Sequence, residues 1–230
     1  MNGHLSIAID GPSGAGKSSL ARRCAERFGF LYVDTGAIYR TVGLAAYRLG
    51  IDRRDTDAVA AMLPTLDIQM AYNAEGEQRM LLNGEDVSAA IRLPEISICA
   101  SDVSALPAVR AYLMEMQRKM AREHNVIMDG RDIGTVVLPQ AELKIFLTAS
   151  AEARAERRMK ELAAKGVPAD FAEVLRDIRY RDEQDSHRAA APLKAAEDAV
   201  PVDTTSLDFA GSEALLCKLI REKLGVEAVK

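Results

Sequence analysis

Short apolar runs rich in β-branched residues recur along the chain, and each one stops at a polar residue or a glycine. They lie at 5–10, 30–34, 125–129, 143–149 and 199–203. Because these runs are nearly continuous rather than alternating, they predict strands covered on both faces, as in a parallel sheet. Segments with helical spacing lie between them, such as "KSSLARRCAERFG", which ends at Gly29. The alternation predicts an α/β doubly wound fold with a five-stranded parallel sheet.

The connection between the second and third runs is too long for one helix. It contains "LDIQMAY" (66–72) and "QRMLLNGEDVS" (78–88), in which Asn83-Gly84 is a hairpin-type turn signal. We therefore predict a small inserted subdomain with antiparallel strands at about 60–100, inside a single domain of residues 1–230. Helical patterns follow at 106–124 and at the C-terminus, and "KGVPAD" (165–170) predicts a loop in which Asp170 and Glu173 begin the next helix.

Carboxylates stand where four of the five predicted strands end. A buried strand seldom tolerates a carboxylate, so these residues predict strand ends, and a turn aspartate is the alternative interpretation. Sheets of this kind bind ligands at the carboxyl ends of their strands. The four residues are Asp10, Asp34, Asp129 and Asp203.

Composition narrows the class of protein further. The chain is 48% hydrophobic and 28% charged, which is ordinary for a globular protein, and its net charge of -4 argues against a strongly basic nucleic-acid binder. Its three cysteines include no CxxC pair, which argues against a disulfide framework or a zinc site. The N-terminus lacks the pattern of a signal peptide, and no run approaches the ~18 apolar residues of a membrane span. We expect a cytoplasmic protein that binds neither nucleic acid nor membrane.

The stretch after the first strand has the composition of a phosphate-binding loop. Glycines let consecutive backbone N–H groups turn toward an anion, and the helix that follows adds its partial positive charge. The lysine of such a loop reaches the β- and γ-phosphates of a nucleoside triphosphate, and the hydroxyl after it can bind Mg²⁺. The residues that match G-x-x-x-x-G-K-[ST] are Gly11, Pro12, Ser13, Gly14, Ala15, Gly16, Lys17 and Ser18.

Three classes of protein carry such a loop: a GTP-hydrolysing switch, a motor or pump, and a kinase for a small acceptor. Guanine recognition in GTPases uses an Asn-Lys-x-Asp motif, and no asparagine here is followed by lysine. Motors usually place a glutamate beside the aspartate of a second apolar strand, whereas "NVIMDG" has only Asp129. In a kinase we instead expect additional arginines near the strand ends, some to bind the acceptor and some to bind the phosphoryl group that is transferred.

Arginines do gather after the predicted strands. "DTGAIYR" places Tyr39 and Arg40 after the second, and "DGRDIGT" places Arg131 and Asp132 after the third. Two further sets have the spacing of a single helix face, namely Arg154, Arg157 and Arg158, and then Arg181, Asp185 and Arg188. Solvated helix faces would give the same spacing, and Arg181 could simply pair with Asp185. Together with the loop at 165–170, the two sets favour a helical lid at 151–188 that closes over phosphates.

In combination these segments resemble a known family. "DGPSGAGKSS", "DTGAIYR", "DGRDIGTVV", "LKIFLTAS…ARAERR" and "YRDEQDSHRAAAPL" are similar to bacterial cytidylate kinases over nearly the whole chain, the insertion included. The resemblance implies a P-loop nucleoside monophosphate kinase with a small inserted NMP-binding subdomain. It also implies transfer of the γ-phosphoryl group of ATP to CMP or dCMP, with Mg²⁺ as the metal.

The resemblance further assigns roles to single residues. Arg40 and Arg131 would hold the monophosphate, with Thr35 and Tyr39 nearby. The cytosine edge would be read by Ser101, Arg110 and Asp132, and the sugar hydroxyls by Arg181 and Asp185, with Arg188 beside the monophosphate or base. Arg154, Arg157 and Arg158 would lie in the lid, and Ser18 or Ser19 would reach the metal. Apart from the resemblance, the position of Asp129 at a predicted strand end near the glycine loop makes it a candidate for holding the waters of magnesium or orienting a neighbour, with a turn cap as the alternative.

Two alternatives stay open at this point. One is a uridylate or mixed pyrimidine monophosphate kinase, and the other is a P-loop protein that binds nucleotide without transferring phosphate. The acceptor-side arginines count against the second. Nothing in the sequence requires more than a monomer.

Overall fold

A computed structural model describes residues 3–164 and 166–229. Lys165, the first residue of the predicted loop 165–170, and the ends of the predicted domain 1–230 lie outside the described residues. The chain divides into two compact units. One takes the chain up to Tyr32 and again from His124, and the other takes Val33–Glu123.

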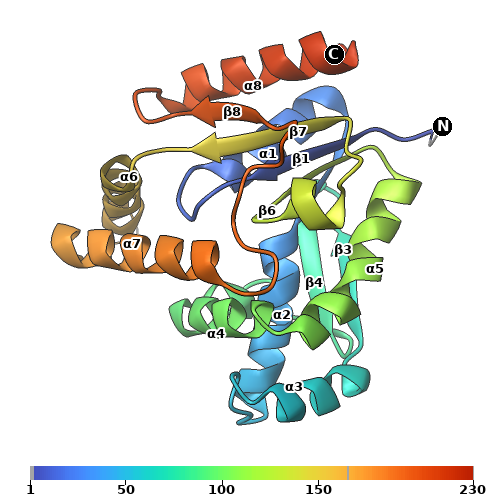
Figure 1. Cartoon of the computed structure of the whole chain (residues 1–230), viewed down its shortest axis with the longest axis vertical. Coiled ribbons are helices and arrows are strands. Elements are labelled where there is room, and N and C mark those ends of the chain that lie inside the picture. The colour runs from blue at the N-terminus through green and yellow to red at the C-terminus, as the bar shows by residue number, and fades with distance from the viewer. Residues whose placement is uncertain (1–2, 165, 230) are drawn as a thin grey trace. The chain divides into compact units, whose positions relative to one another are not determined.

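The first unit is built on a five-stranded sheet in the order β2-β6-β1-β7-β8. Figure 1 labels β6, β1, β7 and β8 of this sheet. β1 pairs in parallel with β6 and β7, and β7 pairs in parallel with β8. β2 leads the chain from this unit into the other. The strands are β1 (Ser6–Asp10), β2 (Leu31–Asp34), β6 (Val126–Gly130), β7 (Leu143–Thr148) and β8 (Val200–Asp203). Each begins and ends within a residue or two of its predicted run, so the predicted α/β fold with a five-stranded parallel sheet is confirmed.

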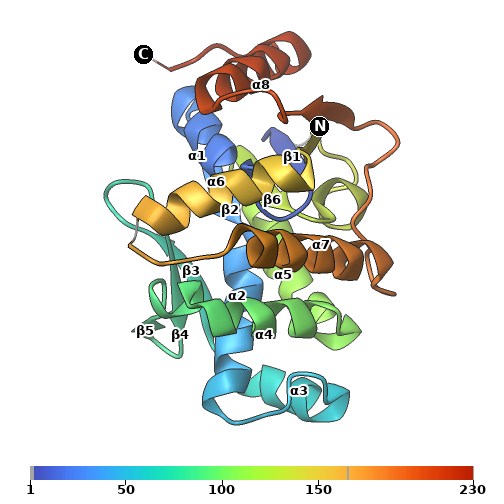
Figure 2. The ribbon, with the colours of Figure 1, turned by 90° about the vertical axis from the view of Figure 1, so that its left-hand side faces the viewer.

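The core of this unit lies where two helices pack on the central strands. The helices of the unit are α1 (Lys17–Phe28), η3 (Ile133–Val137, a π-helical turn), α6 (Ala151–Ala164), α7 (Phe171–His187) and α8 (Phe209–Leu224). Buried side chains of α1 and α8, including Cys24 and Cys217, join those of β1, β6 and β7 in one cluster. The left-handed residue Gly29, with φ 65°, ends α1 as predicted. Figure 2 shows α6 and α7 as neighbouring helices.

One strand differs from its prediction. The run at 199–203 was expected to be covered on both faces, but within β8 only Val202 is buried, and Pro201 and Asp203 are exposed. The reason is position, because β8 is the last strand in the order and has one neighbour. Proline has no N–H to donate and is tolerated at such an edge.

The second unit combines helices with a three-stranded antiparallel sheet in the order β3-β4-β5. Asn83 and Gly84 have φ values of 51° and 81°, and they make the predicted tight turn between β4 and β5. Gly43 lets the helix Thr35–Arg48 approach the helix Pro94–Ser104 closely, since a Cβ there would lie 2.9 Å from the backbone N of Ala100. The elements are α2 (Thr35–Arg48), α3 (Thr56–Met62), η1 (Leu63–Thr65), β3 (Ile68–Tyr72), β4 (Gln78–Leu82), β5 (Glu85–Asp86), η2 (Ala90–Arg92), α4 (Pro94–Ser104) and α5 (Pro107–Glu123).

A helix that spans a membrane must be both long and apolar. Across residues 3–164 and 166–229, no helix is both long and apolar enough.

Candidate active site

The glycine loop of the first unit lies between β1 and α1, as the sequence predicts. Gly11 has φ 150°, and a Cβ there would approach the carbonyl oxygen of Leu147 to 1.9 Å, so only glycine fits between the loop and β7. Gly14 and Gly16 also have positive φ values, of 76° and 90°. Gly16 directly precedes α1, where the helix presents its first backbone N–H groups. The loop therefore has the backbone required to bind an anion.

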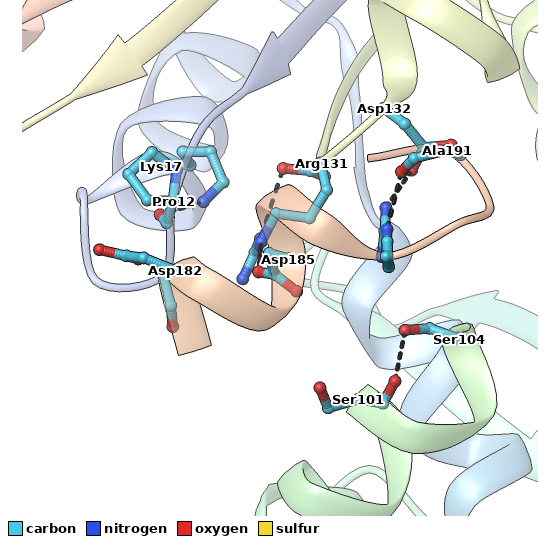
Figure 3. Close-up of polar contacts among 12 residues, drawn as sticks. Pro12, Lys17, Ser101, Ser104, Arg131, Asp132, Asp182, Asp185 and Ala191 are labelled. Atoms are coloured by element: carbon cyan, nitrogen blue, oxygen red, sulfur yellow. Dashed lines mark hydrogen bonds and ion pairs between the residues drawn. The ribbon is translucent and has the colours of Figure 1, made fainter. Parts of the chain in front are cut away.

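Lys17 is the buried cation of this loop. The residue is 5% exposed, and Nζ donates to the carbonyl oxygen of Pro12 at 2.8 Å (Figure 3). Burial, reinforced by the nearby guanidinium of Arg131, lowers the pKa of Lys17 to about 7. The carboxylates of Asp129, Asp10 and Asp185 act in the opposite direction. A phosphate bound in the loop would restore the charged form, because an anion beside a desolvated ammonium group stabilises it.

Asp129, near the end of β6, accepts hydrogen bonds at both carboxylate oxygens. The hydroxyl of Ser18 donates to Oδ2 at 2.9 Å, and the phenol of Tyr32 donates to Oδ1 at 2.8 Å. Ser19, by contrast, is exposed on α1. The hydroxyl that lies beside the strand-end carboxylate is therefore that of Ser18.

Asp10 fixes the segment that follows β6. Its two carboxylate oxygens accept the backbone N–H groups of Ile133 and Gly134 at 2.8 and 2.7 Å. This segment begins with Arg131 and Asp132, so the strand-end aspartate of β1 positions two predicted site residues. Burial raises the pKa of Asp10 to about 6, although the two N–H bonds oppose the shift.

The raised pKa of Asp10 predicts a pH dependence of stability in the nucleotide-free protein. Between about pH 4 and 6 the folded chain keeps a proton on Asp10 that the unfolded chain has lost, so the free energy of unfolding falls as pH rises. Asp10→Asn removes this titration. Urea unfolding from pH 4 to 6.5 should show the stability advantage of the wild type over this variant shrinking by about 2–3 kcal/mol. An advantage that stays constant or grows would contradict the assignment.

Two ion pairs connect the segment after β6 to the end of α7. Arg131 Nε donates to Asp185 Oδ2 at 2.7 Å (Figure 3). Of the Arg131 side chain, 28% stays exposed. Arg188 Nη2 lies 3.3 Å from Asp132 Oδ1, and both side chains are largely buried. Helical spacing would allow Arg181 to pair with Asp185, but Asp185 forms its ion pair with Arg131. Arg181 is exposed on α7. The first unit thus brings together most of its predicted acceptor residues.

The three predicted lid arginines of α6 have three different environments. Arg154 is 4% exposed and holds Asp182 of α7 through two N–H bonds, at 2.9 and 2.6 Å. It also donates to the carbonyl oxygens of Ser13, in the glycine loop, and Ala149. Arg157 donates to the carbonyl oxygen of Thr204 at 2.5 Å, and Arg158 pairs with Glu161 on the exposed surface. Of the three, Arg154 is the one that touches the glycine loop.

In the second unit, Arg40 lies beside a buried carboxylate. Arg40 Nη1 is 3.7 Å from Asp34 Oδ2, and Arg92 Nη2 donates to the same oxygen at 2.9 Å. The other oxygen of Asp34 caps α2 by accepting from the N–H of Ala37. Burial alone would raise the pKa of Asp34, but the guanidinium groups of Arg40 and Arg92 outweigh it, so the pKa lies below its ordinary value.

The remaining predicted residues of this unit form a second group. The guanidinium of Arg110 lies over the ring of Tyr39, 5.6 Å from its centroid, and Nη1 donates to the carbonyl oxygen of Ser104. Ser104 in turn donates from its hydroxyl to the carbonyl oxygen of Ser101 (Figure 3). Arg110, Tyr39 and Ser101 are therefore brought together around the end of α4, and Thr35 is buried in the first turn of α2.

Sequence reasoning missed three contacts of these sites. Arg92 lies at the end of η2, after the antiparallel strands, in a stretch without a motif. Asp182 lies next to Arg181 on α7, where its spacing suggests only a solvated face. Gln78 of β4 exchanges hydrogen bonds with the backbone N–H and C=O of Asp34. A buried carboxylate at a strand end, which needs cations, was the signal that could have led to Arg92.

A glycine loop joining a strand of a parallel sheet to a helix, with a buried lysine at its end, defines a P-loop nucleotide-binding protein of the α/β class. Among solved structures, an uncharacterized protein from Eubacterium ventriosum ATCC 27560 has a similar fold, with a TM-score of 0.50 and 13% identity over 94% of this chain and 98% of that one. This similarity concerns the fold alone.

Sequence comparison then gives the family. The cytidylate kinase family model matches residues 7–222, and the chain belongs to that family. A cytidylate kinase of Geobacter sp. (strain M21) is 51% identical over 95% of this chain and 93% of its own length. A cytidylate kinase of Carboxydothermus hydrogenoformans is 49% identical over 95% of this chain and 98% of its own length. The resemblance seen in the sequence is thereby confirmed.

Proposed function

We propose that this protein transfers the γ-phosphoryl group of ATP to CMP or dCMP, giving ADP and CDP or dCDP. The observation that carries the proposal is the buried Lys17 in a complete glycine loop, within a chain that belongs to the cytidylate kinase family. The related proteins of Geobacter and Carboxydothermus are cytidylate kinases that are 51% and 49% identical to this chain over nearly their whole length, which supports a cytidylate as the acceptor. No observation favours a uridylate kinase or a non-catalytic nucleotide binder.

In this reaction an oxygen of the CMP phosphate forms a bond to the γ-phosphorus while the bond from that phosphorus to the β–γ bridging oxygen breaks. ADP leaves with the electron pair of the broken bond. The transition state spreads negative charge over the transferring oxygens, so the protein acts by alignment and by placing cations. The N–H groups of the glycine loop and Lys17 bind the donor phosphates. Arg154, which contacts the loop at Ser13, is the arginine of α6 best placed to assist them.

Magnesium is part of the proposal. The hydroxyl of Ser18 and the carboxylate of Asp129, 2.9 Å apart, are oxygen donors of the kind that Mg²⁺ prefers. Ser18 would hold the ion directly and Asp129 through water. When bound, Mg²⁺ would neutralise charge on the donor phosphates. The exposed position of Ser19 supports Ser18 over Ser19 for this role.

Acceptor binding is proposed from residues of each unit. In the first unit, Arg131 binds the monophosphate, Asp132 accepts from the exocyclic amino group of cytosine, and Arg181, Asp185 and Arg188 complete the nucleotide contacts. In the second unit, Arg40 binds the monophosphate with Thr35 and Tyr39 nearby, and Ser101 and Arg110 donate to the cytosine acceptors. Arg157 and Arg158 belong to the proposed lid at 151–188, and residues at about 60–100 to the proposed acceptor subdomain. That the protein is a monomer and that it is located in the cytoplasm stay predictions.

The proposal is tested by measuring ADP formation from ATP and Mg²⁺ with CMP, dCMP, UMP, AMP or shikimate. ADP should form rapidly with CMP or dCMP. Uracil presents a carbonyl where cytosine has an amino group, so the Asp132 carboxylate would face an acceptor in place of the base donor, which costs about 1–3 kcal/mol. The kcat/KM for UMP should therefore be at least about tenfold lower than for CMP. Equal turnover of CMP and UMP would contradict the role of Asp132. If ADP formed at the same rate with and without an acceptor, the proposal that the protein is a kinase would be overturned.

A further inference from the structure

The cluster around Asp34 in the second unit has a cation to which no role has been assigned. It consists of Asp34 at the end of β2, Arg40 on α2, Gln78 on β4 and Arg92 at the end of η2. Arg92 Nη2 and Arg40 Nη1 both lie near the same carboxylate oxygen, at 2.9 and 3.7 Å. Because Gln78 is neutral, two positive charges in this cluster share one negative charge, and the cluster carries a net positive charge.

The carboxylate of Asp34 is held rigidly, so it fixes where both guanidinium groups lie. Oδ1 accepts the N–H of Ala37 at 2.9 Å, and the backbone N–H of Asp34 donates to Gln78 Oε1 at 2.7 Å. The Asp34 side chain is 7% exposed, whereas that of Arg92 is 51% exposed. Asp34 therefore acts as a buried anchor from which Arg92 projects toward solvent, whereas the Arg40 side chain is only 27% exposed.

Residue 36, between Asp34 and Arg40 in the sequence, is a glycine, so no side chain occupies the space beside these two groups. A Cβ at Gly36 would lie 3.1 Å from Asp34 Oδ1 and 3.4 Å from Arg40 Nη1, so a side chain would crowd both groups. Arg40 reaches back over the first turn of its own helix at this point. A helix N-terminus favours negative charge, and guanidinium groups bind phosphate through paired N–H donors.

We infer that Arg92 is a second phosphate-binding arginine of the acceptor half, acting beside Arg40 on the monophosphate of CMP, with Asp34 as the residue that positions both. This inference rests on the proposed function and extends it to a residue outside the recognised motifs. The bond to Asp34 uses one of the five N–H groups of a guanidinium. Arg92 also helps Arg40 to balance the buried charge of Asp34, so the test has to separate a contact with the ligand from a purely structural role.

The test compares Arg92→Ala with Arg92→Lys and with a matched control, Arg48→Ala. Arg48 is also a partly exposed arginine of the second unit, paired through two bonds with Glu85 at 2.6 and 2.8 Å, but it lies outside the cluster. Calorimetric titration measures the affinity of each protein for CMP and for cytidine, which lacks the phosphate. Arg92→Ala should weaken CMP binding about 10- to 100-fold and change cytidine binding by less than about twofold.

Steady-state kinetics supply a second readout. Arg92→Ala should raise KM for CMP by a similar factor, with kcat and KM for ATP nearly unchanged, because the contact is made equally in the ground state and the transition state. Arg92→Lys should restore part of the affinity, since it keeps the charge and loses the planar pair of donors. Arg48→Ala should match the wild type in both assays.

The outcomes separate this inference from the proposed function. If the wild type binds and phosphorylates CMP while Arg92→Ala keeps wild-type affinity, the inference alone is overturned. Equal loss of CMP and cytidine affinity, or a lower melting temperature without a change in KM, would assign Arg92 a structural role and also overturn it. A wild type that neither binds nor phosphorylates CMP would overturn the proposed function and this inference together.

Discussion

Arg131→Ala should lower kcat/KM for CMP by about two orders of magnitude or more, because it removes a cation proposed to hold the phosphate that receives the transferring group. The variant also leaves the carboxylate of Asp185, 16% exposed, without its partner at 2.7 Å. We expect this to lower the melting temperature by about 2–4 °C, which corresponds to about 1 kcal/mol. Coupled ADP assays with CMP and thermal unfolding measure the two effects.

Arg179→Ala is the matched control for this experiment. Arg179 lies on α7 and pairs with Glu152 of α6 at 2.7 Å, on the exposed surface of the proposed lid, and it is not among the residues proposed to contact a nucleotide. It should leave kcat/KM unchanged and shift the melting temperature by no more than Arg131→Ala does. If Arg131→Ala loses activity only because it unfolds at the assay temperature, the residue is structural and the assignment is wrong.

Lys17→Met should reduce kcat/KM by about three orders of magnitude without lowering the melting temperature. The loss of activity follows from removing the cation that contacts the donor phosphates. The retained stability follows from burial, because an ammonium group whose pKa is lowered to about 7 is poorly stabilised by its surroundings. Methionine fills a similar volume without a charge, so the melting temperature should equal or exceed that of the wild type.

Lys144→Met is the matched control, because Lys144 is a buried lysine whose charge is balanced by a carboxylate. Lys144 is 8% exposed, and its Nζ lies 2.9 Å from both carboxylate oxygens of Asp198 and 2.6 Å from the carbonyl oxygen of Pro139. This buried ammonium group has its charge balanced, so its removal should lower the melting temperature. If Lys17→Met destabilised the protein as much as Lys144→Met, the interpretation that burial leaves the Lys17 ammonium group poorly stabilised would be contradicted.

The strands and the glycine loop were predictable because their signals are local. An apolar run that stops at aspartate fixes both a strand and its end, and the strands found match the predicted runs to within a residue or two. The turn at Asn83-Gly84 was equally clear, since both residues adopt positive φ, which this pair tolerates best. The exposure of β8 was not predictable in the same way, because it depends on which strand occupies the edge of the sheet.

The interaction partners of the charged residues could not be predicted from the spacing of those residues in the sequence. The interval between Arg154 and Arg157 places them near one helix face, yet Arg154 binds Ser13 and Asp182 whereas Arg157 binds Thr204. Helical spacing likewise allows Arg181 to pair with Asp185, but the ion pair forms with Arg131, which is distant in sequence. Spacing determines where a side chain leaves its helix, and only the tertiary fold determines what it meets.

The hydrogen bonds of Arg154 matter for any attempt to change how this protein binds its phosphate donor. The same guanidinium holds Asp182 on α7 and the carbonyl oxygen of Ser13 in the glycine loop, so the shape of that loop depends on a helix far along the chain. The loop itself tolerates little change, since Gly11 has no room for a methyl group. Adjusting affinity for the phosphate donor is therefore more practicable by redesigning α7 around Asp182 than by editing the loop.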